Sequence, residues 1–209
     1  MTFLSSLTDQ NATLVLDASV VINLLATGHS SEILRSLNAP IVITDNVVRE
    51  IEGGAAAGHS HFDLLRIALN EQILRMEKLN GRILEDFFDL VSGNTAETLG
   101  DGEAATLALA HGYGFIAAID EKKATRIAAE RFGALRLATT VDILAHEAVR
   151  SSLGVNGLAE ATFDAIRLSR MQVREYQFDW VARTIGPARV DACLSLRKYA
   201  RRRPAASPN

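Results

Sequence analysis

The stretch Leu14-Val15-Leu16-Asp17-Ala18-Ser19-Val20-Val21-Ile22-Asn23-Leu24-Leu25 contains two structural signals in direct succession. Its first part is an unbroken apolar run, typical of a strand that is covered on both faces, and this run ends at the carboxylate of Asp17. An apolar segment with helical spacing follows at once, over Val20–Ala26. Ligands of a parallel α/β sheet bind at the carboxyl ends of the strands. Asp17 is therefore a candidate site residue.

Strand and helix signals alternate from this stretch to about residue 150. The predicted strands are Leu14–Asp17, Ile41–Ile43, Ile73–Met76, Phe115–Asp120 and Leu135–Ala138. The predicted helices are Val20–Ala26, Ser31–Leu37, a helix carrying Val47 and Ile51, Phe62–Leu69, Gly81–Leu90, Ala104–His111, Lys122–Phe132 and Val141–Arg150. Loops are expected at Gly53–Gly58 and Ser92–Thr98. The alternation predicts an α/β fold with a doubly wound, mostly parallel sheet flanked by helices.

The character of the chain changes after Gly154, because only helical patterns follow, over residues 156–170, 176–185 and 187–201. We therefore predict an α/β domain over residues 13–155 and a C-terminal helical extension over residues 156–203. The extension is expected to pack on the domain or on a partner. Its basic end, Arg197–Arg203, suits nucleic acid or equally an acidic partner segment.

Composition limits the class of protein. The 209 residues are 48% hydrophobic and 22% charged, which is typical of a soluble globular chain with a core. A net charge of −3 argues against a protein that coats DNA, although a local basic patch is compatible with it. The single cysteine, Cys193, excludes an internal disulfide and is expected to be a buried thiol on a helix. We expect a cytoplasmic protein, because no apolar run reaches membrane length and residues 1–13 do not resemble a signal peptide.

Four acidic residues occupy comparable places in the predicted topology. Asp17 and Asp120 end strands, Glu50 lies in the helix after the second strand, and Glu103, with Asp101 beside it, opens a helix. Strand ends and the starts of the following helices share one edge of a doubly wound sheet, so these acids can converge there. Asp101 either joins them or caps its helix.

Clustered carboxylates repel one another and resist desolvation, and a hard divalent cation removes this conflict. Oxygen ligands with no His or Cys beside them favour Mg²⁺ or Mn²⁺ over zinc. Two such ions about 4 Å apart activate a water and stabilise the leaving oxygen of a phosphodiester. The acids therefore predict metal-dependent phosphodiester chemistry.

Several polar residues near these acids have two interpretations each. Ser19 and Asn23 either hydrogen-bond a ligand carboxylate or water, or cap helices locally. A hydroxyl of Thr139 or Thr140, after the last strand, has the same two interpretations. Glu121 is expected to face solvent. The basic group Lys122, Lys123, Arg126 and Arg131 either contacts the phosphates of a nucleic-acid substrate or forms a solvated helix face.

Four segments together resemble the PIN-domain family, the nuclease fold that includes the toxins of the VapBC toxin–antitoxin systems. They are Leu16–Ile22, Val47–Ile51, Gly100–Ala105 and Ile119–Ala124, and the resemblance covers residues 13 to about 150 or 170. It implies that Asp17, Glu50, Glu103 and Asp120 are catalytic residues that bind Mg²⁺ or Mn²⁺, with Asp101 as the uncertain fifth. It also implies cleavage of single-stranded RNA, a homodimer and, for toxins, an antitoxin partner. Residues 13–155 are then a PIN-like nuclease domain.

Other functions are less well supported by the residues. A phosphatase of the haloacid-dehalogenase type has a second aspartate two residues after the first, where this chain has Ser19. No glycine-rich phosphate loop follows the first strand, which argues against nucleotide binding. A catalytically inert PIN-like module for RNA binding or protein interaction is disfavoured because all four acids are present. The chain is longer than compact PIN toxins, and its last forty or so residues have no counterpart in them.

Overall fold

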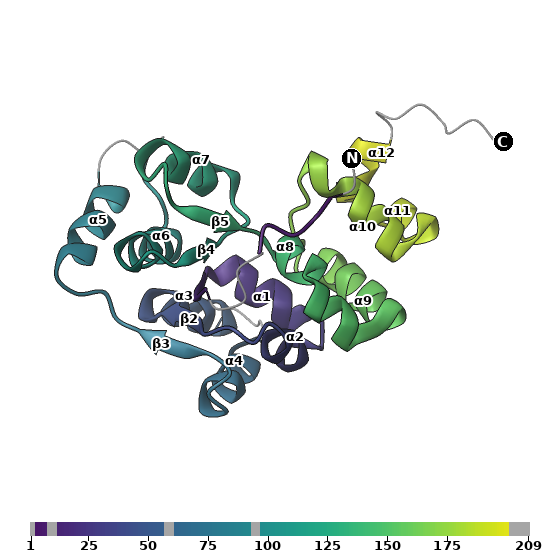
Figure 1. Cartoon of the computed structure of the whole chain (residues 1–209), viewed down its shortest axis with the longest axis horizontal. Helices are drawn as coiled ribbons and strands as arrows, with labels where there is room; N and C mark the ends of the chain where they lie inside the picture. The colour runs from purple at the N-terminus through teal and green to yellow at the C-terminus, as the bar shows by residue number, and fades with distance from the viewer. Residues whose placement is uncertain (1–2, 8–11, 57–60, 93–96, 201–209) are drawn as a thin grey trace.

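A five-stranded parallel sheet forms the centre of the chain in the computed structural model, which describes residues 3–7, 12–56, 61–92 and 97–200 (Figure 1). The strands are β1 (Leu14–Leu16), β2 (Ile41–Thr44), β3 (Arg75–Glu77), β4 (Ile116–Ala118) and β5 (Arg136–Ala138). Their order is β3-β2-β1-β4-β5, and every neighbouring pair is parallel. The chain thus winds outward from β1 in one direction and then from β4 in the other. The predicted doubly wound α/β fold is confirmed.

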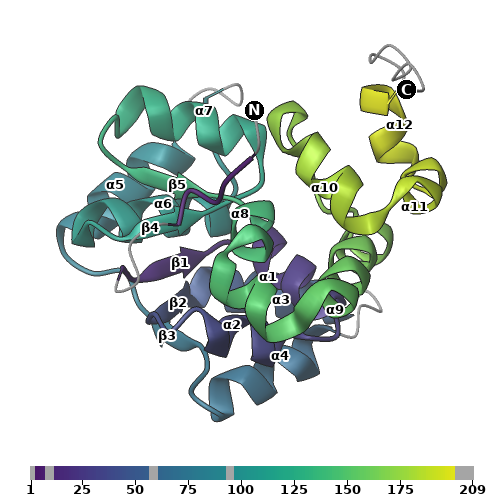
Figure 2. The same ribbon diagram turned by 45° about the vertical axis from the view of Figure 1, so that its right-hand side comes forward.

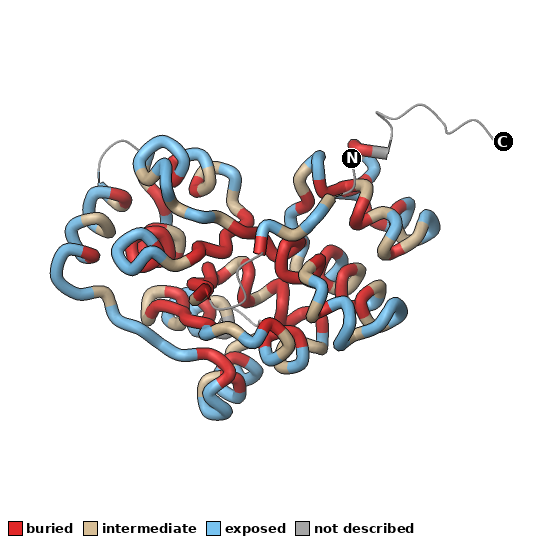
Figure 3. The backbone as a smooth tube through the Cα atoms, in the orientation of Figure 1, coloured by how far each residue is buried: buried red, intermediate tan, exposed pale blue. Residues whose placement is uncertain are grey.

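Alternate residues of the central strands face two separate apolar cores. Leu14 and Leu16 belong to the core on one face of the sheet, whereas Val15 belongs to the core on the other. The register that pairs Val15 with Ala117 continues this alternation into β4. Both faces are therefore covered, which explains why the strands are apolar without a break and why the centre of the molecule is buried (Figure 3).

Helices supply the other half of each core. One face is covered by α1 (Ala18–Ala26), α2 (Ser30–Ser36), α3 (Asp45–Ala56), α4 (His61–Asn70), α8 (Thr140–Ala145) and α9 (Glu147–Leu168). The other face is covered by α5 (Arg82–Val91), α6 (Asp101–Tyr113) and α7 (Lys122–Arg131). None of the described helices is both long and apolar enough to cross a membrane.

The C-terminal helices pack on the first of these faces. They are the 3₁₀ helix η1 (Glu175–Gln177), α10 (Phe178–Ile185), α11 (Pro187–Ala192) and α12 (Leu194–Ala200), and they lie beyond α9 (Figure 2). Phe178 and Trp180 share one apolar cluster with β1, and the hydroxyl of Tyr199 donates to the carbonyl of Val173 at 3.0 Å. The division at residue 155 stays a prediction; α9 is kinked beside it, at Gly154, whose φ of 64° and ψ of −178° are not helical.

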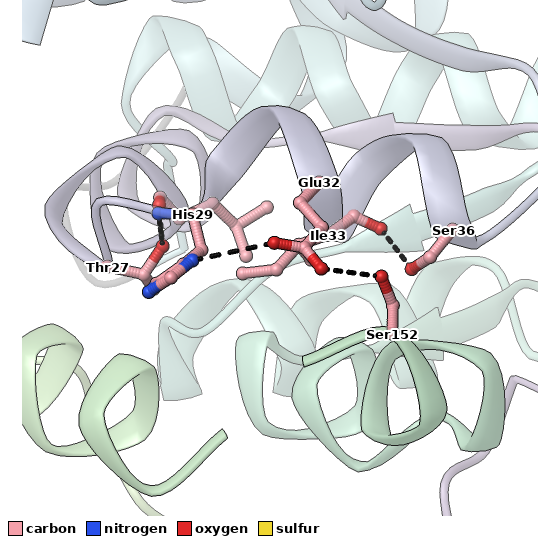
Figure 4. A network of polar contacts seen from close by, with 7 residues as sticks. Thr27, His29, Glu32, Ile33, Ser36 and Ser152 are labelled. Carbon is pink, nitrogen blue, oxygen red and sulfur yellow. Dashed lines mark hydrogen bonds and ion pairs between the residues drawn. The ribbon is translucent and has the colours of Figure 1, made fainter. Parts of the chain in front are cut away.

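A small polar network fixes α9 to α2 (Figure 4). The hydroxyl of Ser152 on α9 donates to Glu32 Oε1 at 2.8 Å, and Glu32 Oε2 lies 3.6 Å from His29 Nδ1. Within α2 the hydroxyl of Ser36 donates to the carbonyl of Ile33. These contacts are exposed and contribute little to stability. The apolar packing between α2 and α9 is the larger contribution.

Several predicted elements are corrected by the structure. The loop expected from Gly53 is wrong as far as Ala56, because α3 continues to that residue. The remaining residues of this loop, 57–60, and residues 93–96 of the second predicted loop lie outside the described residues. Packing of α3 overrides the low helix propensity of glycine there. The predicted helix Val141–Arg150 divides at His146, whose Nδ1 accepts from the backbone N–H of Ala148. Cys193 is buried as expected, but it lies between α11 and α12. The basic residues 201–203 lie outside the described residues.

Replacing Trp180 by alanine tests the packing of the C-terminal helices. Trp180 is 8% exposed, so its removal leaves a cavity, and we expect the free energy of unfolding to fall by about 3–5 kcal/mol. Leu194→Ala is the matched control, because Leu194 is 74% exposed and its loss leaves stability nearly unchanged. Equal urea unfolding curves for the two variants would contradict this packing.

Candidate active site

A pocket of about 420 Å³ lies at the carboxyl ends of β1 and β4, where the strand order reverses. All four acids of the predicted site line it: Asp17, Glu50, Glu103 and Asp120. They come from chain positions more than a hundred residues apart, and the topology alone brings them to one edge. This is the crevice in which doubly wound proteins bind their ligands.

Asp17 follows β1 directly and caps the start of α1. The backbone N–H and the hydroxyl of Ser19 donate to Asp17 Oδ2 at 3.2 and 2.7 Å. The other oxygen, Asp17 Oδ1, is buried and has no hydrogen-bond partner among the described residues. Burial raises the pKa of Asp17, although the hydrogen bonds from Ser19 oppose that rise. An unpartnered buried carboxylate oxygen is costly, which indicates that a ligand belongs beside it.

Asp120 comes two residues after the end of β4 and is held at both oxygens. The backbone N–H of Thr140, in the first turn of α8, donates to Oδ1 at 2.9 Å, and the Thr140 hydroxyl donates to Oδ2 at 2.6 Å. Asn23 on α1 donates its amide to the same Oδ2 at 2.7 Å. Burial nevertheless raises the pKa of Asp120 to about 6. The three hydrogen bonds give the Asp120 side chain one fixed orientation in the pocket.

Glu50 on α3 and Glu103 on α6 also line the pocket. Burial, followed by the negative charge of Asp17, raises the pKa of Glu50 and raises that of Glu103 to about 7. Glu103 Oε2 also accepts from the backbone N–H of Gly100 at 3.2 Å, so this carboxylate caps α6 as well.

Gly102 allows the start of α6 to approach the acids. A side chain at this position would collide with Glu50 Oε2 and would lie 3.6 Å from Asp17 Oδ1. The carboxylates of Asp17 and Glu50 thus meet the backbone of α6 at a position that has no room for a Cβ.

The last wall of the pocket comes from the segment after α9, which we call the wall segment (residues 169–172). Ser169, Arg170 and Gln172 line the pocket, and Gln172 donates its amide to Glu121 Oε2 at 3.0 Å. Just beyond it, Arg174 donates to the carbonyl of Asp120 at 3.0 Å. Sequence reasoning missed this wall. It also placed Glu121 in solvent, whereas Glu121 lines the pocket; its position next to Asp120 was the available signal.

Two predicted neighbours of the acids lie elsewhere. Asp101 is exposed in the first turn of α6 and does not line the pocket, although its charge contributes to the raised pKa of Glu50. Thr139 caps α8: its hydroxyl donates to Asp142 Oδ2 and accepts from Gln177. Thr140, the next residue, takes the expected place beside Asp120.

The basic group on α7 does not line the pocket either. Arg126 pairs with Glu130 at 2.8 Å, and Arg131 donates to the carbonyl of Asp89. The interpretation as RNA contacts therefore finds no support in the pocket itself.

The oxygen donors of the four acids suit a hard divalent cation, but the acids are too far apart for three of them to share one. The part of the chain that the structure describes contains no group of three or more His, Cys, Asp or Glu close enough to hold a metal ion. The unpartnered Asp17 Oδ1 nevertheless fits a cation, and so do carboxylates whose pKa values are raised by burial. Glu50 Oε2 and Asp17 Oδ1 lie beside the same position of Gly102, so these two carboxylates are already neighbours in the pocket.

The fold and the pocket define an α/β protein with a carboxylate-lined site at the switch point of a parallel sheet. A family model described as PIN domain matches residues 13–175. The chain belongs to the PIN-domain family, whose members are generally nucleases that use divalent metal ions. Comparisons with curated proteins and with solved structures gave no significant match.

Proposed function

We propose that this protein is an endoribonuclease that depends on Mg²⁺ or Mn²⁺ and cleaves single-stranded RNA. Asp17, Glu50, Glu103 and Asp120 are its catalytic and metal-binding residues. The observation that carries the proposal is the buried, unpartnered Asp17 Oδ1 in a pocket whose walls hold the other three carboxylates. Membership of the PIN-domain family supports the same reaction class.

Neighbouring side chains hold the two aspartates of the site in place. Ser19 holds one oxygen of Asp17 and leaves the other for the cation, while Thr140 and Asn23 fix Asp120. Glu50 on α3 and Glu103 on α6 complete the set. A bound divalent ion supplies Lewis acidity, which activates water and stabilises the leaving oxygen of a phosphodiester.

We further infer that the protein acts in the cytoplasm as a homodimer and as the toxin of a toxin–antitoxin pair. The resemblance to toxins of this family supports that role. Expression of the wild-type chain is expected to arrest bacterial growth, and co-expression of a small protein encoded beside its gene should restore it. Light scattering is expected to give twice the chain mass of 22.6 kDa; a monomer would contradict the dimer.

A catalytically inert PIN-like module is the alternative, and one observation favours it. No group of three acids in the described residues stands close enough to share an ion without rearrangement. The two functions differ in their response to metal, because an inert module has no need of a cation.

Titration with Mn²⁺ tests the proposal. A ligand that binds only the folded state raises the melting temperature, so Mn²⁺ at a hundred times its Kd should add about 2.7 kcal/mol of stability. The same protein should cleave unstructured RNA in Mn²⁺ or Mg²⁺ and lose this activity in EDTA. The absence of both a thermal shift and cleavage at excess protein would establish the inert module instead.

A further inference from the structure

A second pocket, of about 410 Å³, adjoins the acidic pocket. The two pockets share Ile22, Glu50, Ser169 and Arg170 in their walls, so they form one continuous groove. The volume of the second pocket lies in the range of about 300–1,000 Å³ that is typical of ligand sites.

The lining of the second pocket differs from that of the acidic one. Ile51 on α3 and Leu168 at the end of α9 give it apolar walls, and His61 on α4 adds a flat ring. Glu50 is its only carboxylate among the described lining residues. Apolar surfaces and a flat ring suit the face of an aromatic heterocycle, and single-stranded RNA is recognised by stacking its unpaired bases on such side chains.

Arg170 stands at the junction of the two pockets. It is exposed, and the described residues offer it neither an ion-pair partner nor a hydrogen-bond acceptor. Its φ of 59° is a left-handed conformation that non-glycine residues rarely adopt. Strained residues of this kind gather at ligand sites. A cation at the border of an acidic site is placed to bind the phosphate of a substrate whose base lies on the apolar side.

We infer that the second pocket is a nucleobase subsite and that Arg170 binds the phosphate between that nucleotide and the next. The inference rests on the proposed function and adds a specificity element to it: the nucleotide beside the scissile phosphate is selected by its base. RNA is favoured over an apolar peptide because the pocket is continuous with the carboxylates and has a cation at their border.

Two neighbouring glycines provide a matched pair of variants. Gly54 lines the second pocket, so Gly54→Leu should fill it. Gly53 is the preceding residue of the same helix, and a Cβ there meets nothing within 4 Å. Both substitutions raise the helix propensity of α3, so neither is expected to unfold the protein, and thermal melting checks this.

Binding is measured by fluorescence anisotropy with a short single-stranded RNA whose phosphorothioate linkages resist hydrolysis. We expect Gly54→Leu to weaken binding about tenfold relative to Gly53→Leu, which is the typical effect of losing one stacked base. Arg170→Gly removes the charge and relieves the left-handed backbone. Arg170→Gly should weaken binding and should lower the slope of log affinity against log salt by about 0.7, the value for one phosphate contact. Gly54→Leu should leave this slope unchanged. Arg82→Ala, an exposed arginine in neither pocket, is the control.

The outcomes separate this inference from the proposed function. Cleavage of RNA by the wild type with equal affinities for Gly54→Leu and Gly53→Leu would overturn the subsite alone and leave the pocket to another class of ligand, such as a peptide. Loss of binding in Gly54→Leu and Arg170→Gly by a protein that cleaves no RNA would support the subsite and reject the nuclease. A wild type that does not bind the RNA would overturn both.

Discussion

Asp17→Asn is expected to abolish metal-dependent RNA cleavage and to stabilise the metal-free protein. Several kcal/mol of transition-state stabilisation depend on the cation, so loss of a ligand should lower the cleavage rate about a thousandfold or more. Asparagine caps a helix about as well as aspartate, so the hydrogen bonds from Ser19 to this position can persist. Removing a buried charge beside Glu50 and Glu103 should raise the melting temperature by about 2–4 °C in EDTA.

The two effects have opposite signs, and this makes the test specific. Asp101→Asn is the matched control, because Asp101 is a nearby acid that does not line the pocket. It should retain cleavage and the response to Mn²⁺. Cleavage by Asp17→Asn at the wild-type rate would remove Asp17 from the site. A lower melting temperature in EDTA would show that its main role is the cap of α1.

The stability of the metal-free protein is expected to decrease as the pH rises from 5 to 8. Burial raises the pKa of Asp120 to about 6 and that of Glu103 to about 7, from ordinary values of 3.8 and 4.5. The folded state therefore binds protons more tightly than the unfolded state. Its stabilisation from these groups is complete below the ordinary pKa values and is lost as the pH passes 6 to 7. The expected loss is about 1–3 kcal/mol, chiefly from the buried Asp120.

Mn²⁺ should reverse this loss, and more strongly at pH 8 than at pH 5, because carboxylates bind a metal only when they are deprotonated. Urea unfolding of the wild type at four pH values, in EDTA and in Mn²⁺, measures both effects. Asp17→Asn should give a shallower decrease in EDTA, since one repelling charge is gone. A flat profile, or stability that rises with pH in EDTA, would contradict the assigned electrostatics of the pocket.

The positions of the two aspartates could be predicted from sequence because their signals are local. Leu14–Leu16 and the run before Asp120 are apolar without a break, and each ends in a carboxylate. A buried strand fixes the residue that follows it, and parallel strands end at one edge. Nothing more than the strand order was needed to bring these two side chains into one pocket.

The wall segment could not be predicted in this way. Its residues follow a helix rather than a strand, and their place depends on how α9 packs against α1 and α2, which is a tertiary property. The role of Thr139, in contrast, could have been predicted. The pattern Thr139-x-x-Asp142 is a capping box, and it identifies Thr139 as the cap of α8. The glycines after Glu52 were predicted to lie in a loop because glycine has a low helix propensity. Packing of α3 keeps them in the helix instead.

The late position of the wall segment has a consequence for synthesis. A nascent chain that has emerged through α8 already carries all four carboxylates, but the surface that encloses them is still missing. The crevice closes only when residues 169–172 have left the ribosome and α9 has docked. A nascent chain therefore has a complete pocket only after Gln172 has left the ribosome.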